Sequence, residues 1–367
     1  MDSCNTNSRH KKQPALLVPR YRSSVSYCLL LLSLASLFTT QCRQDPEFAA
    51  PTPSETATDL GGRGNQRIAA MYAAYHDRRE RGNLSGCHSG GFAGKRVIIQ
   101  GFSAFDGATN NMSGVVASSM ALPNFWYDNE PRKPVALDSS NRPYGSGKSG
   151  TYGATAVQRT IYYGDDTYEI CFVVVDVLWD FAPAVLLYEA AQFHPNLILM
   201  SGVGNLPGTA RIETAAINHA GPHTGFDPEG EPYPGEEIPR RDEILPTTDR
   251  SPSMIPMTWN VPHVEQGAHD GREVFRLITG STFQTRVIAP ADRQNDYICN
   301  NISYVTLSGL RGNHLTLAGN ALPLTPMAQP KVTAGFFHYP LNPPIASDLV
   351  FGWSHVVMRI IESAFKN

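Results

Sequence analysis

Three continuous apolar runs constrain the fold of this chain most strongly. They read KRVIIQGF (95–102), YEICFVVVDVLW (168–179) and NLILMSGVG (196–204). Helical patterns stand between them, at 113–122 behind a Ser cap and at 182–193. Strands that are apolar on both faces and are joined through helices are typical of a parallel sheet covered on both sides. We therefore predict an α/β fold with three layers, α/β/α, around a mostly parallel twisted sheet.

The composition fits one large domain with long loops. The chain has 367 residues, of which 41% are hydrophobic, enough for a sizeable core. Lys and Arg total 30 against 33 Asp and Glu. Because the chain has no excess of positive charge, we expect no nucleic-acid partner. The chain has 31 Gly and 28 Pro, so we expect long loop insertions. The segments 123–155 and 221–270 are rich in Pro and polar or charged residues, and we predict that they are such loops.

The N-terminal segment is typical of an export signal. Basic residues up to Arg22 precede an apolar stretch at 27–38, which is shorter than the roughly 20 residues of a membrane span. Cys42 follows directly, so three outcomes stay open: a cleaved export signal, lipid attachment at Cys42, or an uncleaved anchor. We predict a leader at 1–42, a flexible linker at 43–66 and one domain at 67–367, located in the periplasm, outside the cell or lipid-anchored at its surface. Membrane attachment is expected only through the N-terminus.

The cysteine count suggests one reactive thiol. Removal of the leader leaves Cys87, Cys171 and Cys299, an odd number in an oxidising compartment. Whether Cys87 and Cys171 pair stays open. Cys299 stands where the helical pattern at 296–310 begins, and a helix N-terminus would lower the pKa of its thiol. The alternative is an inert buried cysteine.

A nucleophilic cysteine needs a base and a group that orients the base. His338 lies at the end of the apolar strand pattern that begins at 331, and Glu213 begins a helix-like segment after another strand end. Each residue alone is more often structural. Because the carboxyl ends of parallel strands meet at one edge of a sheet, we expect Glu213, His338 and Cys299 to converge there.

Two further patterns are weaker. The glycines at 202, 204 and 208 have the wrong spacing for a dinucleotide loop, and Pro207 interrupts them. His219, His223 and Asp227 lie in a Gly/Pro-rich stretch without helical phase. We therefore predict neither a cofactor nor a metal.

Four short blocks stand in an order that resembles a known family. They read GFSAFDG (101–107), ETAAIN (213–218), YICN (297–300) and GFFHYP (335–340). Together they resemble pyroglutamyl peptidase I, the cysteine peptidases that remove an N-terminal pyroglutamate. The resemblance implies a hydrolase on a phosphorylase/hydrolase-like fold without a cofactor, acting on a peptide or small amide substrate. The family often forms oligomers.

The resemblance also assigns roles. Cys299 would attack the carbonyl, His338 would carry the proton to the leaving amine, and Glu213 would hold the imidazole. Backbone donors at the start of the helix at Cys299 could stabilise the oxyanion. The substrate-binding residues implied by the resemblance are Phe102 and Phe105, which would sandwich the lactam ring, together with Val203 and Asn218.

The chain departs from the family in its substrate loops. Gly202-Val203-Gly204-Asn205 replaces the family's Gly-Gln-Ala-Gly-Gly-Arg, and HTGFDPEG (223–230) replaces Arg-Ile-Pro-Asp-Asn. Acyl-transfer chemistry is therefore better supported than pyroglutamate as the substrate. Two alternatives stay open: the same triad acting on another amide, such as a cell-wall fragment or lactam metabolite, and a catalytically silent surface binding protein.

Overall fold

The computed structural model describes most of the chain beyond residue 56. The described residues are 57–91, 94–103, 111–123, 125–126, 153–219, 243–245, 247–249, 251–289, 297–313, 315–317, 322–324, 331–341 and 346–366. The predicted leader lies outside them, as do Phe105, His223 and Asp227.

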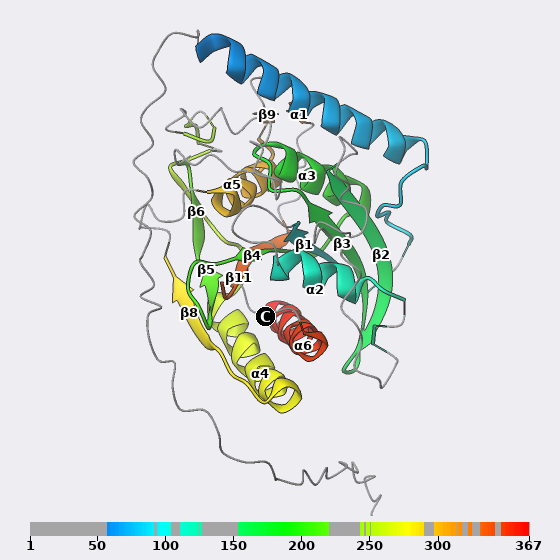
Figure 1. The fold of residues 1–367 in the computed structure, drawn as a ribbon, viewed down its shortest axis with the longest axis vertical. Helices are drawn as coiled ribbons and strands as arrows, with labels where there is room; N and C mark the ends of the chain where they lie inside the picture. Colours follow the sequence, from blue (N-terminus) through cyan, green and yellow to red (C-terminus); the bar gives the residue numbers. More distant parts are fainter. Residues whose placement is uncertain are drawn as a thin grey trace, which may run out of the picture. The chain divides into compact units, whose positions relative to one another are not determined.

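A seven-stranded mixed sheet forms the centre of the fold (Figure 1). Its order is β2-β3-β1-β4-β11-β5-β8. Strands β3, β1, β4 and β11 run parallel, as do β5 and β8, while β2 and β5 are antiparallel to their neighbours β3 and β11. The bounds are β1 Lys95–Phe102, β2 Ala154–Tyr163, β3 Asp166–Val175, β4 Leu197–Val203, β5 Thr209–Glu213, β8 Gln284–Ile288 and β11 Thr333–Tyr339.

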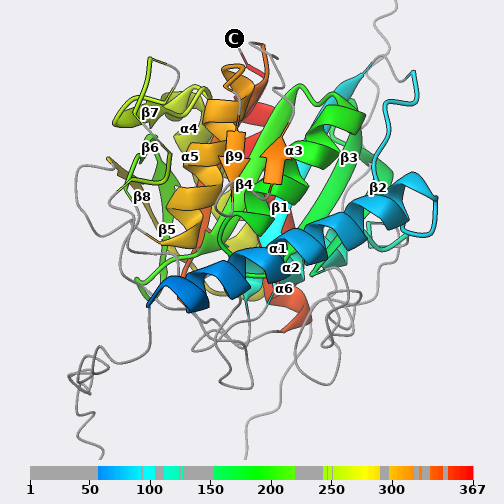
Figure 2. The same cartoon turned by 90° about the horizontal axis from the view of Figure 1, so that it is seen from above.

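Helices cover both faces of this sheet (Figures 1 and 2). One face carries α3 (Phe181–Phe193) and α5 (Ile298–Leu310), with α1 (Ala57–Glu80) lying across α3. The other carries α2 (Met112–Met120), α4 (Val261–Thr279) and α6 (Ser347–Ala364). Two small antiparallel pairs complete the described elements: β6 (Ala215–Ile217) with β7 (Met254–Pro256), and β9 (Leu315–Leu317) with β10 (Leu322–Leu324). The predicted three-layer α/β/α class is confirmed.

The three apolar runs became the central strands because both faces of each are covered. In β3 every residue from Tyr168 to Val175 is buried, and β4 is buried from Leu197 to Gly202. Continuous apolar sequence suits such strands, because neither face meets water.

Several local predictions were wrong. Helix α2 is capped by Asn111, whose side chain accepts from the amide of Ser113, so Ser113 itself lies inside the helix. The stretch 261–270, predicted as loop, belongs to α4. Helix α1 begins at Ala57, before the linker boundary that we expected at 66.

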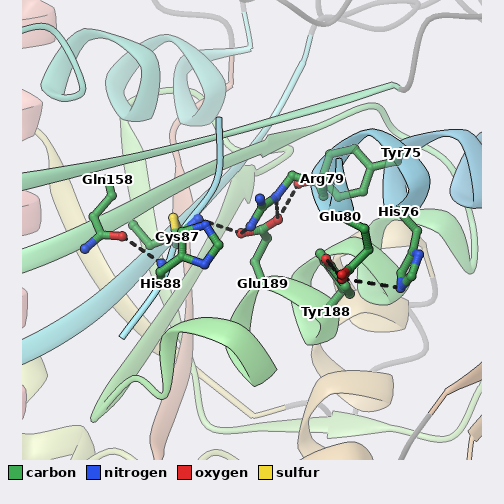
Figure 3. Close-up of polar contacts among 10 residues, drawn as sticks. Tyr75, His76, Arg79, Glu80, Cys87, His88, Gln158, Tyr188 and Glu189 are labelled. Carbon is green, nitrogen blue, oxygen red and sulfur yellow. Dashed lines mark hydrogen bonds and ion pairs between the residues drawn. A yellow bond between two sulfur atoms is a disulfide. The ribbon is translucent and has the colours of Figure 1, made fainter. Parts of the chain in front are cut away.

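A buried carboxylate attaches α1 to α3 (Figure 3). Glu189 of α3 is fully buried and accepts from Arg79 Nε at 2.6 Å and from Tyr75 Oη at 2.7 Å. It also accepts from the amide of Cys87 at 2.9 Å. Because every partner lies outside α3, this one side chain fixes both α1 and the segment that follows it.

The same segment is covalently attached to the sheet. Cys87 forms a disulfide with Cys171 in β3, and Cys299 is the free cysteine among the described residues. The question left open by the sequence is therefore answered, and the odd thiol is the one predicted. No helix in the described ranges combines the length and apolar character needed to span a membrane.

Candidate active site

The candidate site lies on the face of β4, β11 and β5 that the start of α5 covers. Gly202 of β4 and His338 of β11 are register partners, and His338 is in turn opposite Arg211 of β5. Side chains alternate between the faces of a sheet, so Phe336, His338, Arg211 and Glu213 all project from one face. That face is the one α5 covers, because a Cβ on Gly202 would lie 2.7 Å from Cys299 Sγ.

Glu213 and His338 meet directly. Glu213 Oε1 lies 2.7 Å from His338 Nε2, and both side chains are buried. The two groups are not aligned for a hydrogen bond, which is common at unliganded catalytic pairs that tighten when substrate binds. Glu213 ends strand β5 and does not begin a helix, so that prediction was wrong. Because β5 runs antiparallel to β11, Glu213 reaches His338 from beside the middle of β11, and the expectation that it lies at the carboxyl ends of parallel strands was also wrong. Thr214 separates it from the short strand β6.

Cys299 occupies space that a side chain at position 202 would fill. Its Sγ lies over the Cα of Gly202, and the Phe336 ring lies 3.2 Å from the same Cβ position. Residue 299 is the second of α5 and is half-buried. Since Gly202 and His338 are in register, the thiol and the imidazole lie over neighbouring strands on the same face.

The thiol is not activated in this conformation. Desolvation raises the pKa of Cys299 to about 12, and the Glu213 carboxylate acts in the same direction. The Arg211 guanidinium and the amide of Cys299 itself lower the pKa, but less. The expectation that Cys299 forms a thiolate was therefore wrong for the unliganded site, because desolvation and the Glu213 carboxylate outweigh the groups that lower the pKa.

Two buried residues hold the site in place. Asn300 receives a hydrogen bond from the amide of Ile217 at 2.9 Å and donates to the carbonyls of Ile217 and His219. These contacts attach the first turn of α5 to β6. Trp259 donates from Nε1 to the carbonyl of Glu213 at 3.2 Å. Asn300 belongs to a block that the sequence analysis quoted, whereas Trp259 carried no signal there.

Of the three described residues that were predicted to bind substrate, only Phe102 projects from the face that carries Cys299. Phe102 is buried, and it shares the face of Cys299, because Gly101 before it faces Ser113 of α2 on the other side. Val203 lies between Gly202 and Gly204, so its side chain projects from the face opposite Cys299. The Asn218 amide is engaged by the backbone of Leu245 at 3.0 and 2.7 Å and positions that segment.

Arg211 is a residue that the sequence analysis missed. Its guanidinium lies against Gly204, with Nη2 and Nε 2.8 and 3.0 Å from the Cβ position of that glycine. Arg211 lies opposite His338 because β5 pairs with β11, and this pairing joins strands that are far apart in the sequence. The residues around Arg211 therefore do not predict that its side chain lies near the candidate nucleophile.

One group of described side chains has the spacing of metal ligands. It consists of Cys87, Cys171 and Glu189. Both sulfurs are joined in the disulfide, so neither offers a thiolate.

Comparisons with known proteins give fold-level similarity only. No family model and no curated protein sequence matches the chain. Among solved structures, it is similar to a mutant pyrrolidone carboxyl peptidase from Pyrococcus furiosus, with 18% identity, 73% of this chain and 97% of that chain covered, and a TM-score of 0.44. It is also similar to pyroglutamyl peptidase I from Bacillus amyloliquefaciens, with 15% identity, coverage of 74% and 96%, and a TM-score of 0.44.

Proposed function

We propose that this protein is a cysteine-dependent amidohydrolase that removes an N-terminal pyroglutamyl or related lactam group from a small peptide or amide. The proposal is carried by one observation: the free thiol of half-buried Cys299 and a buried Glu–His pair lie on the same face of three neighbouring strands. The four sequence blocks support the same roles.

The roles follow from which atoms are engaged. Nε2 of His338 faces Glu213, so Nδ1 is the ring nitrogen left to act as base, and it has no hydrogen-bond partner among the described residues. Glu213 orients the ring and stabilises the imidazolium that forms during the reaction. Cys299 is the nucleophile.

The reaction then has two steps. In the first, Cys299 Sγ bonds to the acyl carbon while its proton moves to His338 Nδ1. The imidazolium gives that proton to the amine nitrogen, the C–N bond breaks, and a thioester remains. In the second, Nδ1 takes a proton from water as the water oxygen attacks the thioester carbon. That proton returns to sulfur, and the free acid leaves.

A protonated resting thiol fits this sequence. The thiol keeps its proton in the unliganded protein, so His338 must act as a general base during attack. Slow alkylation of Cys299 is thus expected of an enzyme of this kind and does not favour the silent binding protein. Turnover is the measurement that separates the two.

The decisive experiment measures release of a fluorescent amine from its pyroglutamyl amide by the full chain. We expect turnover that is lost in Cys299→Ala and reduced by about 10²–10⁴-fold in Glu213→Gln, while both variants keep the fold. Glu273→Gln, an exposed carboxylate change on α4, is the matched control. Unchanged turnover in Cys299→Ala would remove the nucleophile from the mechanism.

Absence of turnover by the wild type would discard the pyroglutamyl amide as substrate. A panel of other lactam and N-acyl amides then separates the remaining alternatives. Hydrolysis that depends on Cys299 keeps the triad with a different substrate, whereas no hydrolysis of any amide supports the binding protein.

We also propose that the chain acts outside the cytoplasm. The N-terminal export pattern supports this, and so does the disulfide between Cys87 and Cys171, because such bonds persist in oxidising compartments. The mass and N-terminal residue of the mature protein would separate cleavage from lipid attachment at Cys42.

A further inference from the structure

Arg211, close to the candidate nucleophile, has no charge partner among the described residues. Arg211 is half-buried on β5, and its guanidinium lies flat against the backbone of Gly204. No ion pair or hydrogen bond joins that guanidinium to any other described residue, and its Nε is buried without an acceptor. A cation that is partly withdrawn from water without a partner is costly, so a ligand anion would gain by pairing with it.

The distance between the guanidinium and the thiol suits a small substrate. Cys299 Sγ lies over Gly202 and the guanidinium over Gly204. The extended pairing with β11 continues that far, because the Gly204 amide donates to the Tyr339 carbonyl. Two residues of strand separate the groups by roughly 7 Å. A substrate could then place its scissile carbonyl carbon at Sγ and a carboxylate at the guanidinium if about three bonds separate the two carbon atoms.

The strand order decides which part of the substrate this anion belongs to. Phe102, the predicted acyl-binding residue, is on β1, on one side of β4. His338 on β11 and Arg211 on β5 lie on the other side of β4. His338 must reach the leaving nitrogen to protonate it, so the leaving amine extends towards β11. Arg211 therefore lies on the leaving-group side of the scissile bond.

We propose that Arg211 is a specificity-determining residue that binds the carboxylate of the leaving group. The preferred substrates are N-acyl amino acids, such as pyroglutamyl dipeptides with a free C-terminus, and the product amine is a free amino acid. In such a molecule the carboxylate carbon is separated from the scissile carbonyl carbon by the nitrogen and Cα, about 3–4 Å. This inference rests on the proposed function and narrows its substrate class.

The test compares two substrates that differ only in charge. The full chain is assayed with pyroglutamyl-alanine and with pyroglutamyl-alaninamide, and release of each amine is quantified. We expect kcat/KM to be 10- to 100-fold higher for the free acid, as charge-assisted hydrogen bonds imply. In Arg211→Met the two values should become equal within about 3-fold. The ratio between substrates is the readout, because loss of Arg211 also changes the Cys299 thiol and slows both reactions.

A matched control is the neighbouring arginine. Arg286 of β8 is the register partner of Arg211 but is exposed, so Arg286→Met removes the same charge one strand away and should preserve the preference. Equal kcat/KM for the two substrates in the wild type, or a preference that survives Arg211→Met, would overturn the inference while leaving the proposed function intact.

A binding measurement keeps the inference testable if the wild type cleaves neither substrate. That result would contradict the pyroglutamyl substrate of the proposed function. Calorimetry with Cys299→Ala then decides about Arg211. Binding of the free acid at least 10-fold tighter than the amide, lost in the Cys299→Ala/Arg211→Met double variant, supports the anion site. Equal binding, or none, refutes it.

Discussion

Ionisation of the Cys299 thiol gives the most direct test of the site's electrostatics. A thiol with a pKa of about 12 is deprotonated at pH 7 in about one molecule in 10⁵, against a few per cent for an ordinary thiol of pKa about 8.5. That difference lowers the alkylation rate by about 3000-fold. A more basic thiolate is the stronger nucleophile, and a Brønsted slope of about 0.4–0.5 recovers roughly 40-fold. The net expectation is alkylation about 100-fold slower than that of a free thiol.

The assay treats the unliganded full chain with iodoacetamide between pH 6 and 10 and quantifies the Cys299 peptide by mass spectrometry. Glutathione in the same buffer supplies the reference rate. The rate should rise about tenfold per pH unit without a plateau. Glu213→Gln removes a charge that raises the thiol pKa and should speed labelling, whereas Arg211→Met removes one that lowers it and should slow labelling.

A labelling plateau with a midpoint below pH 8 would refute this reasoning. It would mean that thiolate and imidazolium form a stable pair before substrate arrives. The triad assignment would survive, but the general-base role of His338 in the first step would not.

Three further predictions concern the framework. Glu189→Gln should cost about 3–5 kcal/mol in urea unfolding, because Arg79 becomes an unpaired buried charge; the exposed change Glu80→Gln is the control, and equal effects would contradict the role of Glu189. Reduction of the Cys87–Cys171 disulfide, which spans 84 residues, should lower stability by about 4–5 kcal/mol; a thermal midpoint unaffected by dithiothreitol would argue against this, and a Cys87→Ser/Cys171→Ser variant should not respond to the reductant. Asn300→Ala should cost about 2–4 kcal/mol, since it removes three hydrogen bonds between the buried Asn300 side chain and the partly buried backbone of Ile217 and His219. Wild-type unfolding free energy in Asn300→Ala would show that water replaces the lost contacts.

The central strands and two of the site residues could be predicted because their signals are local. Continuous apolar runs at β1, β3 and β4 can hardly form anything but buried strands. The places of Cys299 at the start of a helix and of His338 at the end of a strand were also predicted from local patterns, whereas their proposed roles needed the four sequence blocks together.

Helix α4 was missed because its glycines have a packing role. Gly267 and Gly271 look like helix breakers, yet a Cβ at either position would lie 2.5 Å from the Arg359 carbonyl oxygen or 2.7 Å from Val356 Cα of α6. Close contact between the helices requires glycine there. The flanking signals, Asn260 as N-cap and Gly280 at the C-terminus, were present in the sequence.

The properties that could not be predicted depend on distant strands. Glu213 was placed in a helix because the pairing of β5 with β11 has no local signature. The raised thiol pKa has the same origin, since a helix N-terminus is a local feature whereas desolvation and the Glu213 carboxylate come from the assembled sheet.

The position of β11 has a consequence for synthesis of the protein. This strand is the last of the sheet in chain order, yet it lies between β4 and β5. Until the ribosome has released residues 333–339, the strands on either side have no common neighbour, and Glu213 has no imidazole to hold. Nascent and prematurely terminated chains therefore hold at most Glu213 and Cys299 of the proposed triad, which is completed only after translation of the sheet.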